Sequence, residues 1–279
     1  MATMKTKRAV WQIILNIVLI ALLIANIFPV LWMVSSSLKE ADELFSTRIY
    51  LIPHRPTLAH YQTVLTEYGF GTWLKNSVVT TIGITILQIV VSVMAAFALG
   101  YYHTKLNSFV FYFLLLTMVI PFQVTMIPNY IVTSKMGLLN TWSGVILPNV
   151  ANATTFFFLY QHIRSVPRAY YEVARIEGGN ALWTLKHVTI GLCKGAISAI
   201  AILTVIESWN IYFWPLLVLS KPEARTLTIG LKQVLDFESG NRWGPFMATA
   251  TLASLPVVVV YLFLQKHIIA AFVSSGIKG

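Results

Sequence analysis

A polar loop between apolar stretches carries the residues best suited to chemistry in this 279-residue chain. It reads PRAYYEVARIEGGNALWTLKHV over residues 167–188. Its first proline suits the start of a helix, where a missing N–H has no intrahelical partner, and Ser165 lies close enough to cap that helix. Glycine readily takes the left-handed conformation that follows a helix, so the helix is expected to end at Gly178–Gly179. Asn180 is then the N-cap of a second helix that runs to Val188.

The first helix of this loop presents small and apolar residues next to charged ones. Its apolar surface is expected to comprise Tyr170, Val173, Ala174 and Ile176. A short helix with such a surface is suited to docking in a groove of another protein. The same pattern also fits an amphipathic loop that lies on a membrane surface. The residues alone leave both interpretations open.

Sequence motifs for catalysis are missing from this chain. It has no G-x-x-x-x-G-K-[ST] run that could cradle phosphates, so the chain is predicted not to hydrolyse nucleoside triphosphates and not to be an enzyme. The six histidines are scattered and form no H-E-x-x-H motif, and a single cysteine excludes an internal disulfide framework. We expect no metal or other cofactor on this chain.

A second group of candidate residues lies inside apolar sequence. Glu207 is a carboxylate that costs roughly 2.5–3.5 kcal/mol in a membrane span unless it faces water or a partner. Trp209 and Asn210 close to it offer a stacking face and hydrogen bonds to a polar solute that passes between the helices. Further polar side chains in or near apolar stretches are Gln123, Asn149 and Asn152. Amides also hydrogen-bond between packed helices, so helix packing is the alternative role for this group.

The elements that position these residues are predicted to be membrane-spanning helices. The chain is 57% hydrophobic and 11% charged, with a mean hydropathy of +0.72, which is typical of a polytopic membrane protein. A span needs roughly 20 mostly apolar residues. Six stretches qualify, at about 11–35, 74–100, 108–130, 139–161, 195–219 and 245–266. The predicted fold is all-α with six transmembrane helices.

The charged residues lie mostly between the apolar stretches. If the N-terminus lies inside, the inner segments hold eleven Lys and Arg residues, including Lys278, and two acidic residues. The outer segments hold nine Lys and Arg residues and seven acidic residues. This distribution favours two cytoplasmic termini. The net charge of +10 does not indicate nucleic-acid binding, because the basic residues are not gathered into one patch.

The polar loop resembles the EAA motif of carbohydrate-type ABC import permeases. That pattern is close to E-A-A-R-I-D-G, and residues 172–178 read E-V-A-R-I-E-G. Glycines at 191 and 195 stand where the family usually has prolines. Further matches follow in the family's order at Phe28–Trp32, Ser37–Glu40, Pro56–Tyr61, Trp209–Asn210, Trp214–Leu216 and Gly276–Gly279. Together these segments resemble the small-subunit group of maltose permeases.

The resemblance implies a type I ABC importer permease in a bacterial inner membrane, forming half of a path for a sugar or oligosaccharide. Residues 1–72 would form an N-terminal transmembrane helix and external loop, and residues 73–279 a five-helix core with a cytoplasmic coupling loop at 162–194. The implied partners are a second permease subunit, two ATPase subunits that hold ATP and Mg, and an external solute-binding protein.

In this family the loop docks on the ATPase. The implied roles are an ion pair for Glu172, close approach at Ala174 and a turn at Gly178, with Tyr171, Arg175 and Ile176 as further contacts. Three alternatives remain: the same architecture for glycerol phosphate or an anionic saccharide, a stand-alone secondary transporter, and a membrane enzyme. A secondary transporter is disfavoured because the sequence shows no two similar halves. A membrane enzyme is disfavoured by the missing metal and nucleophile motifs.

Overall fold

Helices form all the regular secondary structure that the computed structural model describes, namely in residues 2–46, 50–102, 104–235 and 242–276. The α-helices are α1 (Ala2–Ser37), α2 (Ala41–Leu44), α3 (Ala59–Thr66), α4 (Phe70–Tyr101), α5 (Asn107–Thr117), α6 (Phe122–Lys135), α7 (Trp142–Ile146), α8 (Ala153–Arg164), α9 (Arg168–Ile176), α10 (Ala181–Thr184), α11 (Ile190–Trp209), α12 (Phe213–Val218), α13 (Leu227–Val234) and α14 (Trp243–Gly276). Short 3-10 turns are η1 (Leu147–Asn149) and η3 (Pro222–Ala224), and η2 (Leu185–Thr189) is a π-helical turn. The all-α prediction is confirmed. Lys278 and the end of the predicted motif Gly276–Gly279 lie outside the described residues.

Four of the described helical stretches are long and apolar enough to cross a bilayer. They are Trp11–Ser37, Phe70–Tyr101, Ala181–Trp209 and Trp243–Phe263. The shortest has 21 residues, which at 1.5 Å per residue matches the roughly 30 Å of hydrocarbon. A helix is the stable choice there because it satisfies its own backbone N–H and C=O groups. The first, second and sixth predicted spans coincide with these helices.

The third predicted span, 108–130, is wrong as a single helix. It consists of α5 and α6, which are bent by 98° at the break between them. Pro121 stands at this break in an extended conformation, with φ −61° and ψ 141°. Proline disfavours a helical conformation at the residue before it and supplies no N–H to continue the helix. The count of six spans therefore stays a prediction, since the described residues show four long helices and one bent pair.

The fourth predicted span, 139–161, is also interrupted. It is divided into α7, η1 and α8, and α8 starts afresh after Asn152. The Asn152 side chain accepts a hydrogen bond of 2.9 Å from the backbone N–H of Thr155 and so caps the new helix. The mean hydropathy of this region does not reveal the interruption, because one capping residue, Asn152, determines where the new helix begins.

The fifth predicted span lies too far along the chain. α10, η2 and α11 follow one another without a gap, so the apolar helix runs over Ala181–Trp209 and not over 195–219. The prediction that the second loop helix ends at Val188 is wrong for the same reason. The glycines at 191 and 195 lie inside α11 and do not interrupt it. Beyond Trp209 the chain turns and forms the separate helix α12.

The chain forms two compact units, and the division predicted at residues 72 and 73 stays a prediction. The first unit comprises Met1–Phe70 and Leu231–Ser254. In it, the Lys39 side chain is 2% exposed, with its ammonium 4.1 Å from the centroid of the Trp32 ring. Burial lowers the pKa of Lys39. The Ser37 and Tyr61 hydroxyls lie 2.6 Å apart, and the His60 ring lies 2.8 Å from the Lys39 carbonyl oxygen.

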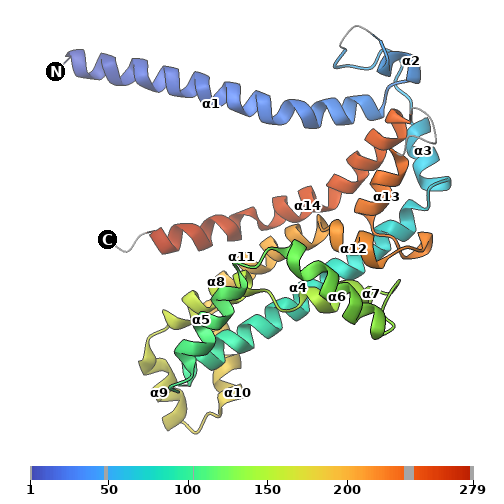
Figure 1. The fold of residues 1–279 in the computed structure, drawn as a ribbon. Coiled ribbons are helices and arrows are strands. Elements are labelled where there is room, and N and C mark those ends of the chain that lie inside the picture. Colours follow the sequence, from blue (N-terminus) through green and yellow to red (C-terminus); the bar gives the residue numbers. More distant parts are fainter. Residues whose placement is uncertain (1, 47–49, 103, 236–241, 277–279) are drawn as a thin grey trace. The chain divides into compact units, whose positions relative to one another are not determined.

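The second unit comprises Gly71–Gly230 and Leu255–Gly279. One apolar cluster includes Phe156, Leu159 and Ile163 of α8, and a second surrounds Trp214. Polar pairs tie the helices together, since Gln88 donates to the Thr155 hydroxyl at 2.6 Å and Trp214 donates to the Gly144 carbonyl at 3.0 Å. Figure 1 shows α9 and α10 together at one end of this unit.

Candidate coupling surface

The loop predicted to dock forms a helix, a glycine turn and a second helix. Gly178 has φ +79°, a left-handed conformation, and its N–H donates to the Arg175 carbonyl at 3.1 Å. Asn180 accepts a hydrogen bond of 2.9 Å from the Trp183 N–H and is the N-cap of α10. The predicted helix end and the predicted cap are both confirmed.

The predicted cap at Ser165 is wrong. Its hydroxyl donates to the His162 carbonyl at 2.7 Å, so it belongs to the end of α8. Pro167 occupies the N-cap position of α9, and no side chain caps that helix. A serine that follows a helix can reach a carbonyl three residues back in the same turn.

A second glycine allows α9 and α10 to approach each other. A Cβ atom added at Gly179 would lie 2.8 Å from both the Ala174 carbonyl oxygen and the Trp183 ring. The Gly179 N–H donates to that same carbonyl at 2.8 Å. The close packing of the two helices therefore requires the absence of a side chain at this position.

Between α9 and α10 lies a mostly apolar hollow of about 320 Å³. It is lined by Ala169, Tyr170, Val173, Ala174, Glu177, Trp183 and Val188. Ala174 is only 2% exposed and lies within this packing, whereas Ile176 is 86% exposed beside the hollow. An exposed apolar patch of this kind is typical of a contact surface. Sequence reasoning missed the contribution of Trp183 and Val188, because it depends on how α10 folds back on α9.

Aromatic contacts fix α9 to the end of the long helix α4. The Tyr171 ring lies 5.7 Å from Tyr101 and 6.5 Å from Phe97, centroid to centroid. The Arg175 guanidinium lies 5.8 Å from the Tyr101 ring. Burial raises the pKa of the half-buried Tyr171. The contacts of Tyr101 and Phe97 with α9 were not predicted, because no sequence pattern places the end of α4 next to the loop.

Glu172, also on α9, takes no part in these ring contacts. Its side chain is exposed, and it makes no ion pair with any residue that the structure describes. An exposed carboxylate beside an apolar surface can pair with a basic group of another protein at little desolvation cost.

The residues predicted to line a substrate path are distributed over several elements. Glu207 and Gln123 are exposed, on α11 and α6, whereas Trp209 is only 9% exposed. The amides at Asn210, Asn149 and Asn152 make hydrogen bonds to backbone groups of their own neighbourhood, to Ile206, Val145 and Thr155. None of the six lines the hollow beside α9.

Residues 69–273 match the family described as binding-protein-dependent transport system inner membrane component. The chain belongs to this family. It is therefore a membrane-spanning permease component of a transport system of that kind, and the recognised resemblance to ABC import permeases is confirmed.

Curated relatives cover nearly the whole chain. An arabinooligosaccharides transport system permease protein, AraQ, of Halalkalibacterium halodurans is 32% identical over 96% of this chain and 96% of that protein. An sn-glycerol-3-phosphate transport system permease protein, UgpE, of Brucella suis is 28% identical over 96% of this chain and 98% of that protein. In the crystal structure of a bacterial ABC transporter involved in the import of the acidic polysaccharide alginate, one chain has a TM-score of 0.84 at 24% identity. The structural match covers 92% of this chain and 96% of that chain, which shows that the two share a fold.

Proposed function

We propose that this chain is the permease subunit of an ATP-driven importer and forms half of the path for an oligosaccharide. The observation that carries the coupling role is the exposed apolar surface of α9 and α10, which is joined to α4 through Tyr171 and Tyr101. The family and the names of the relatives support the transport role. ATP and Mg are bound by partner ATPase subunits.

The proposed coupling is mechanical. When ATP closes the two ATPase subunits, α9 moves with the subunit on which it is docked. The Tyr171–Tyr101 contact passes this movement to α4, and the unbroken helix Ala181–Trp209 passes it across the bilayer. The spans then change between inward-open and outward-open states. Glu207, Trp209 and Asn210 are the proposed contacts with the solute.

The proposed assembly contains a second permease subunit, two ATPase subunits and an external solute-binding protein. The chain lies in a bacterial inner membrane with both termini in the cytoplasm. The excess of Lys and Arg over acids in the segments that include the α9–α10 loop supports this orientation.

Co-purification from native membranes tests the coupling role. Ile176→Asp places a charge on the exposed apolar surface, and Ile52→Asp is a matched control because Ile52 is 79% exposed outside the long helices. We expect Ile176→Asp to lose the ATPase subunits and keep the second permease, and Ile52→Asp to keep both. An Ile176→Asp chain that retains the ATPase in normal amount would exclude the docking role.

Glycerol phosphate is the second candidate solute, because the relatives named for it match 96% of this chain. Uptake into proteoliposomes that contain the purified assembly distinguishes the two. Accumulation of a labelled arabinose oligosaccharide supports the first proposal. Accumulation of labelled sn-glycerol 3-phosphate alone supports the second.

A further inference from the structure

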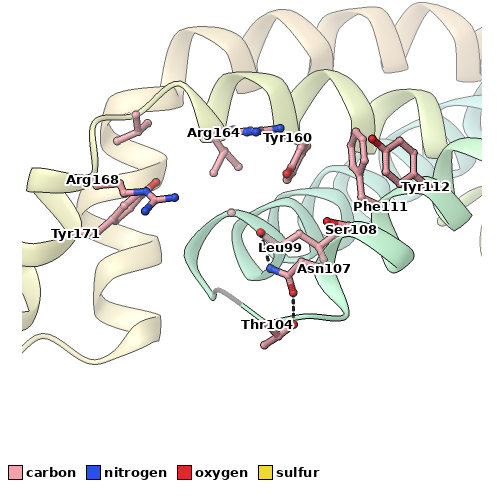
Figure 2. A pocket seen from close by; sticks show the side chains of 13 residues that line it. Leu99, Thr104, Asn107, Ser108, Phe111, Tyr112, Tyr160, Arg164, Arg168 and Tyr171 are labelled. Carbon is pink, nitrogen blue, oxygen red and sulfur yellow. Dashed lines mark hydrogen bonds between the residues drawn. The ribbon is translucent and has the colours of Figure 1, made fainter.

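A second cavity, of about 450 Å³, lies beside the coupling surface within the second compact unit. It is enclosed by the end of α4, the start of α5, the end of α8 and the start of α9 (Figure 2). None of the 13 residues that line it is acidic, and two are arginines, Arg164 and Arg168. The cavity is therefore cationic, unlike the mostly apolar hollow between α9 and α10.

The two arginines have no counter-ion among the described residues. Neither makes an ion pair, and Arg164 is placed only by its ring contact with Tyr160, at 6.0 Å. Figure 2 shows both guanidinium groups on the α8–α9 side of the cavity. A guanidinium carries five N–H donors in a planar fork that matches the oxygens of a phosphate. Two such groups beside one cavity are suited to a phosphate anion.

The opposite wall carries neutral polar groups that are already held in place. The Asn107 amide donates to the Leu99 carbonyl at 3.0 Å, and the Thr104 hydroxyl donates to the Asn107 side chain (Figure 2). These bonds fix the connection between α4 and α5. Ser108 lies next to this brace and makes no hydrogen bond within the described residues through its hydroxyl. This wall is therefore preformed, and the Ser108 hydroxyl can donate a hydrogen bond to a ligand.

The outer face of α5 continues from this cavity as an exposed aromatic surface. Phe109, Tyr112 and Phe113 are each more than half exposed, and the rings of Phe109 and Phe113 are stacked 6.2 Å apart. Tyr112 also lines the cavity, so the polar and apolar regions share one side chain. A ligand that fills both regions has an anionic head and a hydrocarbon body.

We propose that this cavity binds the phosphate of an anionic glycerophospholipid, with its acyl chains along the outer face of α5. Basic pockets between helices at the cytoplasmic surface are typical sites for anionic headgroups. The proposal goes beyond the transport role and takes from it only the orientation of the chain. It also places a lipid against α9, because Arg168 is the first residue of that helix.

Cysteine protection in lipid nanodiscs tests the proposal. Ser108→Cys in a Cys193→Ala background places a thiol in the cavity, and Ser165→Cys places an exposed control thiol outside it. We expect phosphatidylglycerol to slow maleimide labelling of Cys at 108 about tenfold relative to phosphatidylcholine, without slowing the control. In an Arg164→Gln, Arg168→Gln chain the protection should disappear. It should persist in Lys186→Gln, Lys194→Gln, which removes two exposed charges elsewhere in the loop and α11.

Three outcomes overturn the proposal. Equal labelling in the two lipids shows that no anionic headgroup enters. Equal protection by millimolar inorganic phosphate in phosphatidylcholine nanodiscs shows that the ligand is a soluble phosphate. Protection that requires added ATPase subunits shows that a protein fills the cavity. Because the purified chain is used without transport, a failed transport role would leave this test intact.

Discussion

The turn between α9 and α10 depends on backbone conformation at one residue. Gly178 has φ +79°, and no atom lies within 4 Å of a Cβ added there. Substitution therefore strains the backbone without a steric clash. An L-residue pays roughly 1–2 kcal/mol for the left-handed conformation, and asparagine adopts it more readily than alanine.

Gly178→Ala should therefore open the loop more often than Gly178→Asn. We expect trypsin cleavage after Arg175 to be about fivefold faster in Gly178→Ala than in the unmodified chain, with Gly178→Asn in between. Timed digestion of the purified chain and mass spectrometry of the fragments measure this. Equal rates for alanine and asparagine would show that the conformation of Gly178 is not what holds the turn.

The Glu43 carboxylate gives the first compact unit a defined pH response. It accepts hydrogen bonds of 2.8 Å from the backbone N–H of His54 and 2.8 Å from its ring, and the backbone bond is the main reason that its pKa is lowered. A carboxylate whose pKa is lowered in the folded state stabilises the fold at pH values above its unfolded pKa of about 4.3. This stabilisation is lost as the pH falls through the folded-state pKa.

The unmodified chain should consequently unfold at a higher temperature than Glu43→Gln near neutral pH. We expect this difference to shrink as the pH drops from about 5 toward 3. Thermal unfolding in detergent at a series of pH values measures it. A difference that stays constant over this range would contradict the assignment.

At the scale of elements, the aromatic contact between α9 and α4 is expected to carry movement and not to hold the ATPase. Tyr171→Leu keeps an apolar side chain but removes the ring contacts with Tyr101 and Phe97. Sugar uptake by the assembly should fall severalfold while the amount of co-purified ATPase stays unchanged. Tyr130→Leu on α6 is the control and should affect neither. Loss of the ATPase in Tyr171→Leu would assign this residue to docking.

Several predictions from sequence succeeded where local chemistry decides the structure, although the local cap predicted at Ser165 was wrong. A proline, two glycines and Asn180 are enough to set the limits of α9 and the start of α10, because caps and turns depend on a few neighbouring residues. Long apolar stretches likewise identified α1, α4 and α14. The breaks at Pro121 and Asn152 were missed because a single residue hardly changes the mean hydropathy of a long stretch.

The parts of the site that were not predicted depend on contacts between distant segments. Ala174 was expected at an exposed surface, and it is buried because α10 folds against it. Tyr101 meets Tyr171 only through the packing of α4 with the loop. No residue type or spacing announces these contacts.

At the scale of the whole molecule, the apolar helix α1 is not covered by the rest of its own compact unit. No described side chain from Trp11 to Leu31 is buried. An exposed apolar surface of this length is unstable in water, so α1 needs a lipid or protein surface to cover it.

A charge in the middle of α1 should therefore prevent stable assembly in the membrane. Ile20→Lys costs about 3 kcal/mol on insertion scales, whereas Leu58→Lys, outside the long helices, costs little. The amount of chain in the membrane fraction, measured by immunoblot, should drop for Ile20→Lys only. Equal amounts of the two variants would show that α1 does not lie in the bilayer.

The unbroken helix from Ala181 to Trp209 also fixes an angular register. Each residue turns an α-helix by about 100°, so deleting one residue of α11 after the π turn at Leu185–Thr189 would rotate the rest of the helix relative to the loop. The direction in which Glu207 points is thereby set by the number of residues between it and the loop. A change of water access at Glu207→Cys after deletion of Gly191 would report that rotation. Deletions at the start of α11 are thus a means of turning the face on which Glu207 lies without substituting any residue of that face.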